Sequence, residues 1–143
     1  MVVPNIPNNS LTEEIKEIVS LCQQLEPRYG KKATYFNPPA TEEEIIAWEN
    51  EHEITIPETY KDWLRFSNGS QLLFDLARFN DLNHLVVGNE FVSDDLVIIG
   101  TLIGDGEFLC FSKKTGKIVR HNHGKMREYD NMNKVIKKLL NIV

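Results

Sequence analysis

Hydrophobic residues recur at helical spacing near both ends of the chain. Between residues 10 and 27 the apolar positions lie three or four residues apart, and Ser10 is followed by Glu13, as in a helix-capping box. This pattern predicts a first helix that begins at Ser10 and ends at Pro27. Residues 132–143 repeat apolar positions at the same spacing, with lysines on the opposite side, and they predict a last helix.

Two shorter helices are predicted between residues 41 and 70. Thr41 followed by Glu44 forms a second capping box. Pro57 suits the first turn of the next helix, because the N–H that it lacks would have no helical partner there. The Asn-Gly pair at 68–69 then ends that helix, since both residues tolerate a left-handed backbone.

Short apolar runs alternate with turn residues in the rest of the chain. Runs at this spacing predict an antiparallel sheet, with a hairpin turn at residues 113–116. The runs at 96–99 and 108–111 are apolar on both faces, so we expect them to be central strands. The predicted fold is a single α+β domain, with a central antiparallel sheet of about five to six short strands packed against N-terminal helices and a C-terminal helix. The predicted strands are 72–74, 85–87, 96–99, 108–111 and 118–120, with a further short strand at 33–36.

The order of residues from 54 onwards is distinctive. Residues 54–64 read Ile-Thr-Ile-Pro-Glu-Thr-Tyr-Lys-Asp-Trp-Leu, and Ser-Asn-Gly follows at 67–69. Ile-Ile-Gly at 98–100 precedes a glycine-rich turn and an apolar strand at 104–111, and another strand is expected at 118–123. This order resembles the SUKH superfamily over roughly residues 41–143, which leaves a helix and a loop at 1–40 outside the resemblance. Ser70, Arg120 and Asn122 depart from the superfamily pattern.

The resemblance implies a protein-binding function rather than catalysis. Bacterial members of the superfamily are immunity proteins that bind and neutralise a toxin encoded beside them, and related members regulate yeast cell-wall synthesis. We therefore expect an intracellular immunity protein that occludes the active surface of a cognate toxin domain, such as a nuclease. A regulatory scaffold of the same fold is the alternative, and the neighbouring genes would distinguish the two.

Charge is unevenly distributed along the chain. Residues 1–112 carry 19 acidic and 7 basic side chains, whereas residues 113–143 carry 2 acidic and 9 basic ones. Seven glutamates and no lysine or arginine occur between residues 41 and 58. A dense acidic surface favours a basic protein partner and disfavours nucleic acid. The candidate residues for this surface are Glu42, Glu43, Glu49, Glu51, Glu53, Asp94, Asp95, Asp105 and Glu107. Trp48 or Tyr60 would add an aromatic anchor if exposed.

No motif of nucleophilic, phosphate-binding or metal-dependent catalysis is present in the sequence. His121 and His123 alternate on a predicted strand, and with Cys110 they would make an incomplete metal site, because zinc needs three or four protein ligands. We therefore predict no catalytic residue, metal or cofactor. A small metal-dependent hydrolase that uses His121 and His123 remains the rival hypothesis. Cys22 and Cys110 are expected to be buried and reduced.

The first ten residues contain no basic residue and no apolar run, so they do not resemble a secretory signal. No stretch approaches the roughly 18 apolar residues of a membrane span. These two observations predict a cytoplasmic protein without a membrane partner. The oligomeric state is not predicted.

Overall fold

A computed structural model describes residues 1–103, 107–122 and 124–143. Its helices are α1 (Thr12–Tyr29), α2 (Glu42–His52), α3 (Glu58–Leu64), the short 3-10 helix η1 (Leu82–His84) and α4 (Met132–Ile142). Its strands are β1 (Tyr35–Phe36), β2 (Ser70–Leu72), β3 (Ala77–Phe79), β4 (Val86–Val87), β5 (Leu96–Leu102), β6 (Glu107–Ser112), β7 (Ile118–Asn122) and β8 (Lys125–Tyr129).

All strand pairs are antiparallel and belong to one sheet. The strand order is β1-β2-β3-β5-β6-β7-β8, and β4 pairs with β5 beyond the end of β3. The α+β fold with a central antiparallel sheet is confirmed, as is the hairpin that joins β6 to β7, in which the Gly116 N–H donates to the Ser112 carbonyl at 2.9 Å. Within the described residues the sheet has eight strands. This is more than predicted, because the pattern of apolar runs did not identify β3 and β8.

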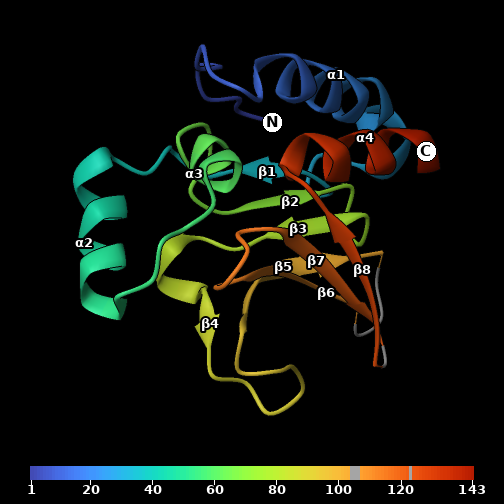
Figure 1. The fold of residues 1–143 in the computed structure, drawn as a ribbon. Coiled ribbons are helices and arrows are strands. Elements are labelled where there is room, and N and C mark those ends of the chain that lie inside the picture. Colours follow the sequence, from blue (N-terminus) through green and yellow to red (C-terminus); the bar gives the residue numbers. More distant parts are fainter. Residues whose placement is uncertain (104–106, 123) are drawn as a thin grey trace.

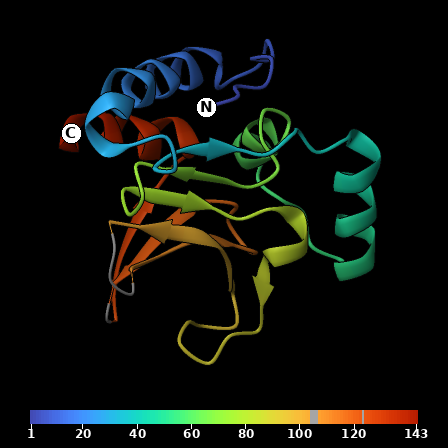
Figure 2. The ribbon, with the colours of Figure 1, turned by 180° about the vertical axis from the view of Figure 1, so that it is seen from behind.

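The main core lies between the sheet and three helices. α1, α3 and α4 contribute apolar side chains that meet those of β2, β3, β5 and β6, and α1 packs beside α4 (Figures 1 and 2). Helices from both ends of the chain therefore cover one face of the sheet, as predicted. α2 lies at the side of the molecule, where it contacts η1 and adds the buried Ile45 and Trp48 to this core.

A second, smaller core covers part of the other face. It consists of side chains from β5, β6 and β7, together with Val92 from the loop between β4 and β5. β5 and β6 are consequently covered on both faces, which explains why residues 96–99 and 108–111 are apolar without a break. The buried members of this cluster are Val92, Leu96, Ile98, Cys110 and Val119.

Both predicted ends of the first helix are wrong. α1 begins at Thr12, because the Ser10 hydroxyl bonds to the Asp62 carboxylate instead of capping the helix. The helix also continues past Pro27 to Tyr29, where Gly30 takes a φ of +98° and its N–H donates to the Glu26 carbonyl at 2.7 Å. Pro27 lies in the last turn, so its ring disturbs only the end of the helix.

The predicted strand at 72–74 is shorter in the structure. β2 ends at Leu72, because Leu73 and Phe74 have φ values of +46° and +58° and turn the chain toward β3. A left-handed backbone is unfavourable for residues other than glycine, and hydrogen bonds to residues 33 and 34 stabilise it here. The Leu73 N–H donates to the Thr34 hydroxyl at 3.0 Å, and the Phe74 N–H donates to the Ala33 carbonyl at 2.7 Å.

The aromatic residues of α3 join the helices to the sheet. The Tyr60 hydroxyl donates to the carbonyls of Asn80 and Ile99 at 2.6 and 3.2 Å, and the Trp63 indole donates to the Ser70 hydroxyl at 3.0 Å. Both rings are fully buried, and so are Leu64 and Phe66. The residues that resemble the SUKH pattern here are therefore core residues.

Candidate functional site: an acidic ridge on α2

The orientation of α2 is fixed by its capping box and its inner side. The Thr41 N–H donates to the Glu44 carboxylate at 2.9 Å, and the Glu44 N–H donates to the Thr41 hydroxyl at 3.1 Å. Ile45 and Trp48 are buried, and the His52 ring stacks on Trp48 with 4.2 Å between centroids. This inner side holds the opposite side of the helix toward solvent.

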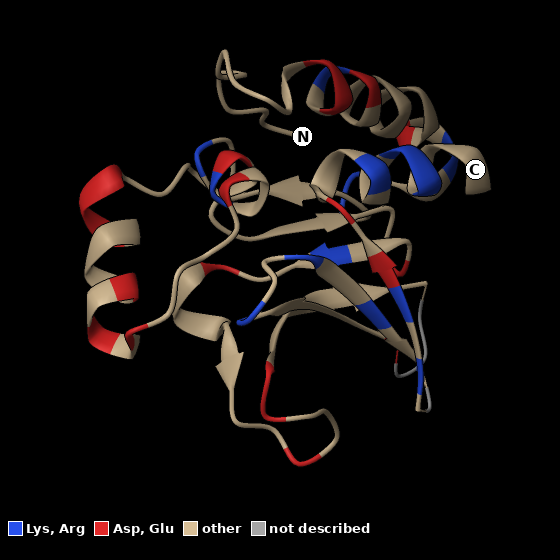
Figure 3. Ribbon diagram, viewed as in Figure 1, with Lys and Arg blue, Asp and Glu red and all other residues tan. Residues whose placement is uncertain are grey.

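The outer side of α2 and the residue that follows the helix form a surface that we call the acidic ridge. It comprises Glu43, Ile46, Glu51 and Glu53, all exposed, and Ile46 is 53% exposed. None of its three glutamates forms an ion pair with another described residue. Glu53 follows the helix with a left-handed backbone, at a φ of +54°. The ridge therefore presents free negative charge and one exposed apolar side chain on α2, which carries acidic residues near both of its ends (Figure 3).

Glu42 lies beside the ridge but is paired with Arg65. The Arg65 guanidinium donates to Glu42 at 2.5 and 3.2 Å, to Glu58 at 2.7 Å and to Asp62 at 2.7 Å. These hydrogen bonds from Arg65 lower the pKa of Glu42 and of Glu58. Arg65 thus connects the start of α2 to α3 and offsets part of the negative charge that the sequence places there.

Glu49 has a structural role on the inner side of α2. Its carboxylate accepts the Ile56 N–H at 2.8 Å and lies 3.3 Å from the Lys61 ammonium. Its side chain is only 18% exposed. These contacts attach α2 to the segment that leads into α3, so Glu49 is not part of the free charge of the ridge.

The remaining acidic candidates do not gather beside α2 as one surface. Asp94 is exposed in the loop before β5. Asp95 accepts the Ser112 hydroxyl at 2.5 Å, and this bond lowers its pKa; it also accepts the Lys114 N–H at 3.0 Å. Glu107 is buried beside Arg120 on β7. Asp105 lies outside the described residues.

Trp48 and Tyr60 are both buried, so neither is available as an aromatic anchor. Ile46 is the exposed apolar residue of α2 instead. The sequence analysis missed it, because a single isoleucine in a helix next to Ile45 is indistinguishable from a core position until the helix is oriented against its neighbours.

The histidine and cysteine candidates do not form a metal site within the described residues. No group of three histidine, cysteine, aspartate or glutamate side chains there could hold a metal ion. His121 is paired across the strands with Phe108, whereas Cys110 is paired with Val119 and fully buried. Burial raises the pKa of the Cys110 thiol to about 12, so it stays protonated at neutral pH. His123 lies outside the described residues.

Basic side chains gather away from the acidic ridge. β7, β8 and α4 carry most of the lysines and arginines of the C-terminal segment, and they lie on the side of the molecule opposite α2 (Figure 3). The uneven charge along the sequence is thus also uneven in space.

The model of the SMI1 / KNR4 family (SUKH-1) matches residues 39–139. This match spans most of the chain and includes α2, α3, every strand from β2 to β8 and most of α4. The chain belongs to this family.

In this SUKH-1 protein the family match begins just before α2, so α1 and β1 lie outside it. The core of the SUKH-1 protein nevertheless includes α1, whose Leu11, Ile15 and Ile18 are fully buried. A search of curated proteins finds no match. In the described part of the chain, no helix combines the length and the apolar character that crossing a membrane requires. Family membership supports a role in protein interaction or immunity.

Proposed function

We propose that this SUKH-1 protein is an immunity protein that neutralises a toxin domain encoded beside it. The proposal rests on family membership together with the acidic ridge, which combines the exposed carboxylates of Glu43, Glu51 and Glu53 with the exposed Ile46. The partner is a basic toxin surface, such as the substrate channel of a nuclease. Docking on that surface blocks it stoichiometrically, without chemistry by the immunity protein.

The ridge would act in two steps. Its unpaired carboxylates attract a basic surface over a distance, which raises the association rate at low salt. Ile46 then supplies apolar area at the centre of the contact, where a buried side chain surrounded by polar residues contributes most to affinity. Glu42 and Glu49 contribute less, because each is already paired, with Arg65 and Lys61 respectively.

A co-expression rescue assay with the toxin domain of the adjacent reading frame tests the proposal. The ridge variant carries Glu43→Lys and Glu51→Lys. The control carries Glu17→Lys and Asp75→Lys, which change net charge equally at exposed positions on α1 and on the loop before β3. We expect the ridge variant to lose protection and the control to keep it.

Stopped-flow measurement of the association rate at low and high salt tests whether the charge of the ridge attracts the toxin. The wild-type association rate should fall as salt rises, because charges are screened beyond about 10 Å at 0.1 M salt. The ridge variant should associate about tenfold more slowly at low salt and show little salt dependence. If His121→Ala abolishes protection while the ridge variant protects fully, the acidic ridge is not the toxin-binding surface and a histidine-centred site replaces it.

A further inference from the structure

β8 is an edge strand that the proposed immunity mechanism does not use. It runs antiparallel to β7, and among the described residues no other strand pairs with it. Its residues from Lys125 to Glu128 are exposed, and Tyr129 is half-buried. In an edge strand, every second residue directs its N–H and C=O away from the sheet, so β8 offers backbone groups to an added strand.

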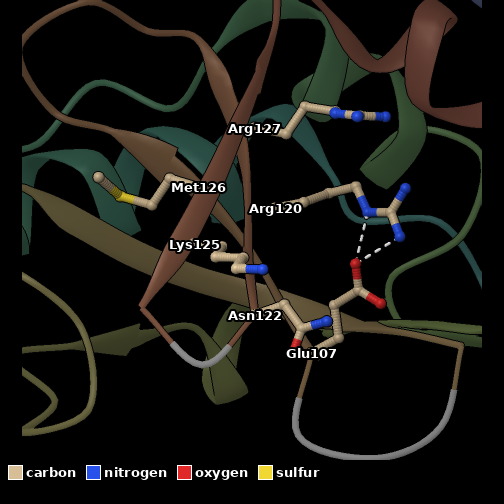
Figure 4. Close-up of a pocket in the computed structure, with 6 residues that line it drawn as sticks. All are labelled: Glu107, Arg120, Asn122, Lys125, Met126 and Arg127. Carbon is tan, nitrogen blue, oxygen red and sulfur yellow. Dashed lines mark hydrogen bonds and ion pairs between the residues drawn. The ribbon is translucent and has the colours of Figure 1, made fainter.

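One face of β8 carries an excess of positive charge. Arg127 lies directly across the strands from Arg120, and Lys125 lies on the same face opposite Asn122. Like charges placed directly opposite each other destabilise a strand pair. These cations and Glu107 line a hollow of about 620 Å³. Figure 4 shows their side chains.

Glu107 neutralises only Arg120 in this hollow. Its carboxylate accepts the Arg120 Nε at 2.7 Å and forms an ion pair with the same guanidinium. Arg120 also donates to the Tyr129 hydroxyl at 3.2 Å. Lys125 and Arg127 have no ion-pair partner among the described residues, so this face of β8 attracts a negatively charged ligand.

The other face of β8 is partly apolar. Met126 is 62% exposed and lies across from His121, which lies across from Phe108 on β6. Met126 also lines the hollow, but its side chain extends to the opposite side of β8 from those of Lys125 and Arg127 (Figure 4). From Lys125 to Glu128 the exposed side chains therefore read cation, apolar, cation and anion, and the anion, Glu128, is paired with Lys117.

We propose that β8 binds an extended acidic peptide segment of another protein as an additional strand. Acidic side chains at every second position would lie opposite Lys125 and Arg127 and relieve the repulsion between Arg127 and Arg120. An apolar side chain between them would lie on the other face, next to Met126. Main-chain hydrogen bonds to the free edge supply affinity, and the alternation of side chains supplies specificity.

A second copy of this chain is a poor occupant of the edge. Antiparallel pairing of β8 with β8 about Met126 would place Lys125 of one copy opposite Arg127 of the other, which like-charge repulsion opposes. A free inorganic anion would use the cations but not the backbone edge. An acidic peptide strand would contact both the cations and the free backbone edge, so we choose it as the ligand.

Fluorescence anisotropy with labelled seven-residue peptides tests the proposal on the whole chain. One peptide alternates glutamate and valine, a second has the same composition with the glutamates contiguous, and a third alternates lysine and valine. We expect the alternating acidic peptide to bind roughly tenfold more tightly than the contiguous one, because only the former matches the period of a strand. The lysine peptide should not bind.

Two variants locate the site. Lys125→Glu with Arg127→Glu should weaken binding about tenfold or more. Lys137→Glu with Lys138→Glu makes the same charge change on the exposed side of α4 and should leave affinity within about twofold. Circular dichroism melting of both variants checks that each remains folded.

Amide hydrogen exchange distinguishes an added strand from attraction by charge alone. The amides of β8 that face away from β7 should exchange about tenfold more slowly when the alternating acidic peptide is bound. The proposal would be overturned if the two acidic peptides bound equally well, or if exchange at β8 did not change. It would also be overturned if inorganic phosphate at millimolar concentration competed with the peptide, or if the β8 and α4 variants lost affinity equally.

Discussion

Gly100 of β5 approaches the main chain of β3 so closely that a Cβ atom on it would lie 2.0 Å from the Arg78 carbonyl oxygen. The register between β5 and β6 also shifts between Ile98 and Gly100, which marks a bulge at this point. The glycine of the Ile-Ile-Gly sequence therefore permits the sheet to bend while β3 and β5 stay paired.

Gly100→Ala should destabilise the protein strongly, because the added methyl group meets a backbone oxygen that cannot rotate away. We expect a loss of about 3 kcal/mol or more in the free energy of unfolding, measured by urea denaturation. Gly116→Ala is the control, because there is open space around its Cβ position. This variant should lose only about 1–2 kcal/mol in the free energy of unfolding, because its φ of +73° is unfavourable for alanine. Equal losses would show that space at Gly100 does not matter.

Trp63→Ala should lower the free energy of unfolding by about 3–5 kcal/mol, as truncation of a large core aromatic does. The Trp63 ring is fully buried and contacts Phe66 and Phe79 edge-on, at 5.4 and 4.8 Å between centroids. Ile46→Ala on the acidic ridge should change stability by only about 0.5 kcal/mol. A melting temperature that hardly moves in Trp63→Ala would contradict the core role.

Arg65→Met should destabilise the protein in a pH-dependent way. The pKa values of Glu42 and Glu58 are lowered in the folded state, so their ion pairs with Arg65 stabilise it fully above the ordinary glutamate pKa of 4.5. This stabilisation is lost as the pH falls through the lowered pKa values, because protonation then favours the unfolded chain.

We expect Arg65→Met to cost about 1 kcal/mol at pH 7, because Glu42 and Glu58 are exposed and solvent screens their ion pairs with Arg65, and clearly less below about pH 4. Urea denaturation at both pH values measures the difference. Lys16→Met removes an exposed ion pair with Glu13 and should be nearly neutral at either pH. A cost for Arg65→Met that does not depend on pH would show that its packing, not its charge, stabilises α2 and α3.

Cys22 and Cys110 should not react with a thiol reagent in the native protein. Burial raises their pKa values to about 11 and about 12, so the reactive thiolate is scarce at neutral pH. Ellman's reagent at pH 7.5 should modify both thiols in urea and neither within minutes in buffer. Because raised thiol pKa values favour the protonated folded state, stability should fall as the pH rises above the ordinary value of 9.0. Rapid labelling in buffer would contradict their burial.

The sequence predicts those elements whose signals are local. The capping box of α2 depends on Thr41 and Glu44 alone, and the structure contains both of its hydrogen bonds. The apolar runs of β5 and β6 identify central strands, because only strands covered on both faces are apolar throughout. β8 was missed for the converse reason: its Lys-Met-Arg-Glu sequence is exposed, and it is a strand only because it pairs with β7.

The acidic candidates show where prediction from sequence ends. Glu49, Asp95 and Glu107 look like surface charges in the sequence, but each has a partner from another segment: Lys61, Ser112 and Arg120 respectively. Such partners depend on how helices and strands approach each other, which periodicity does not determine. Burial and pairing separate these three residues from the exposed, unpaired glutamates of the acidic ridge, which is the surface that we propose.

The packing of α1 against α4 has a consequence for how the chain folds. The Asn133 amide donates to the Ser10 carbonyl at 2.8 Å and to Glu14 at 2.7 Å, across separations of 123 and 119 residues. Contacts so distant in sequence require the closure of a long loop, which slows folding relative to domains built from local contacts. We expect stopped-flow refolding to take roughly milliseconds to seconds.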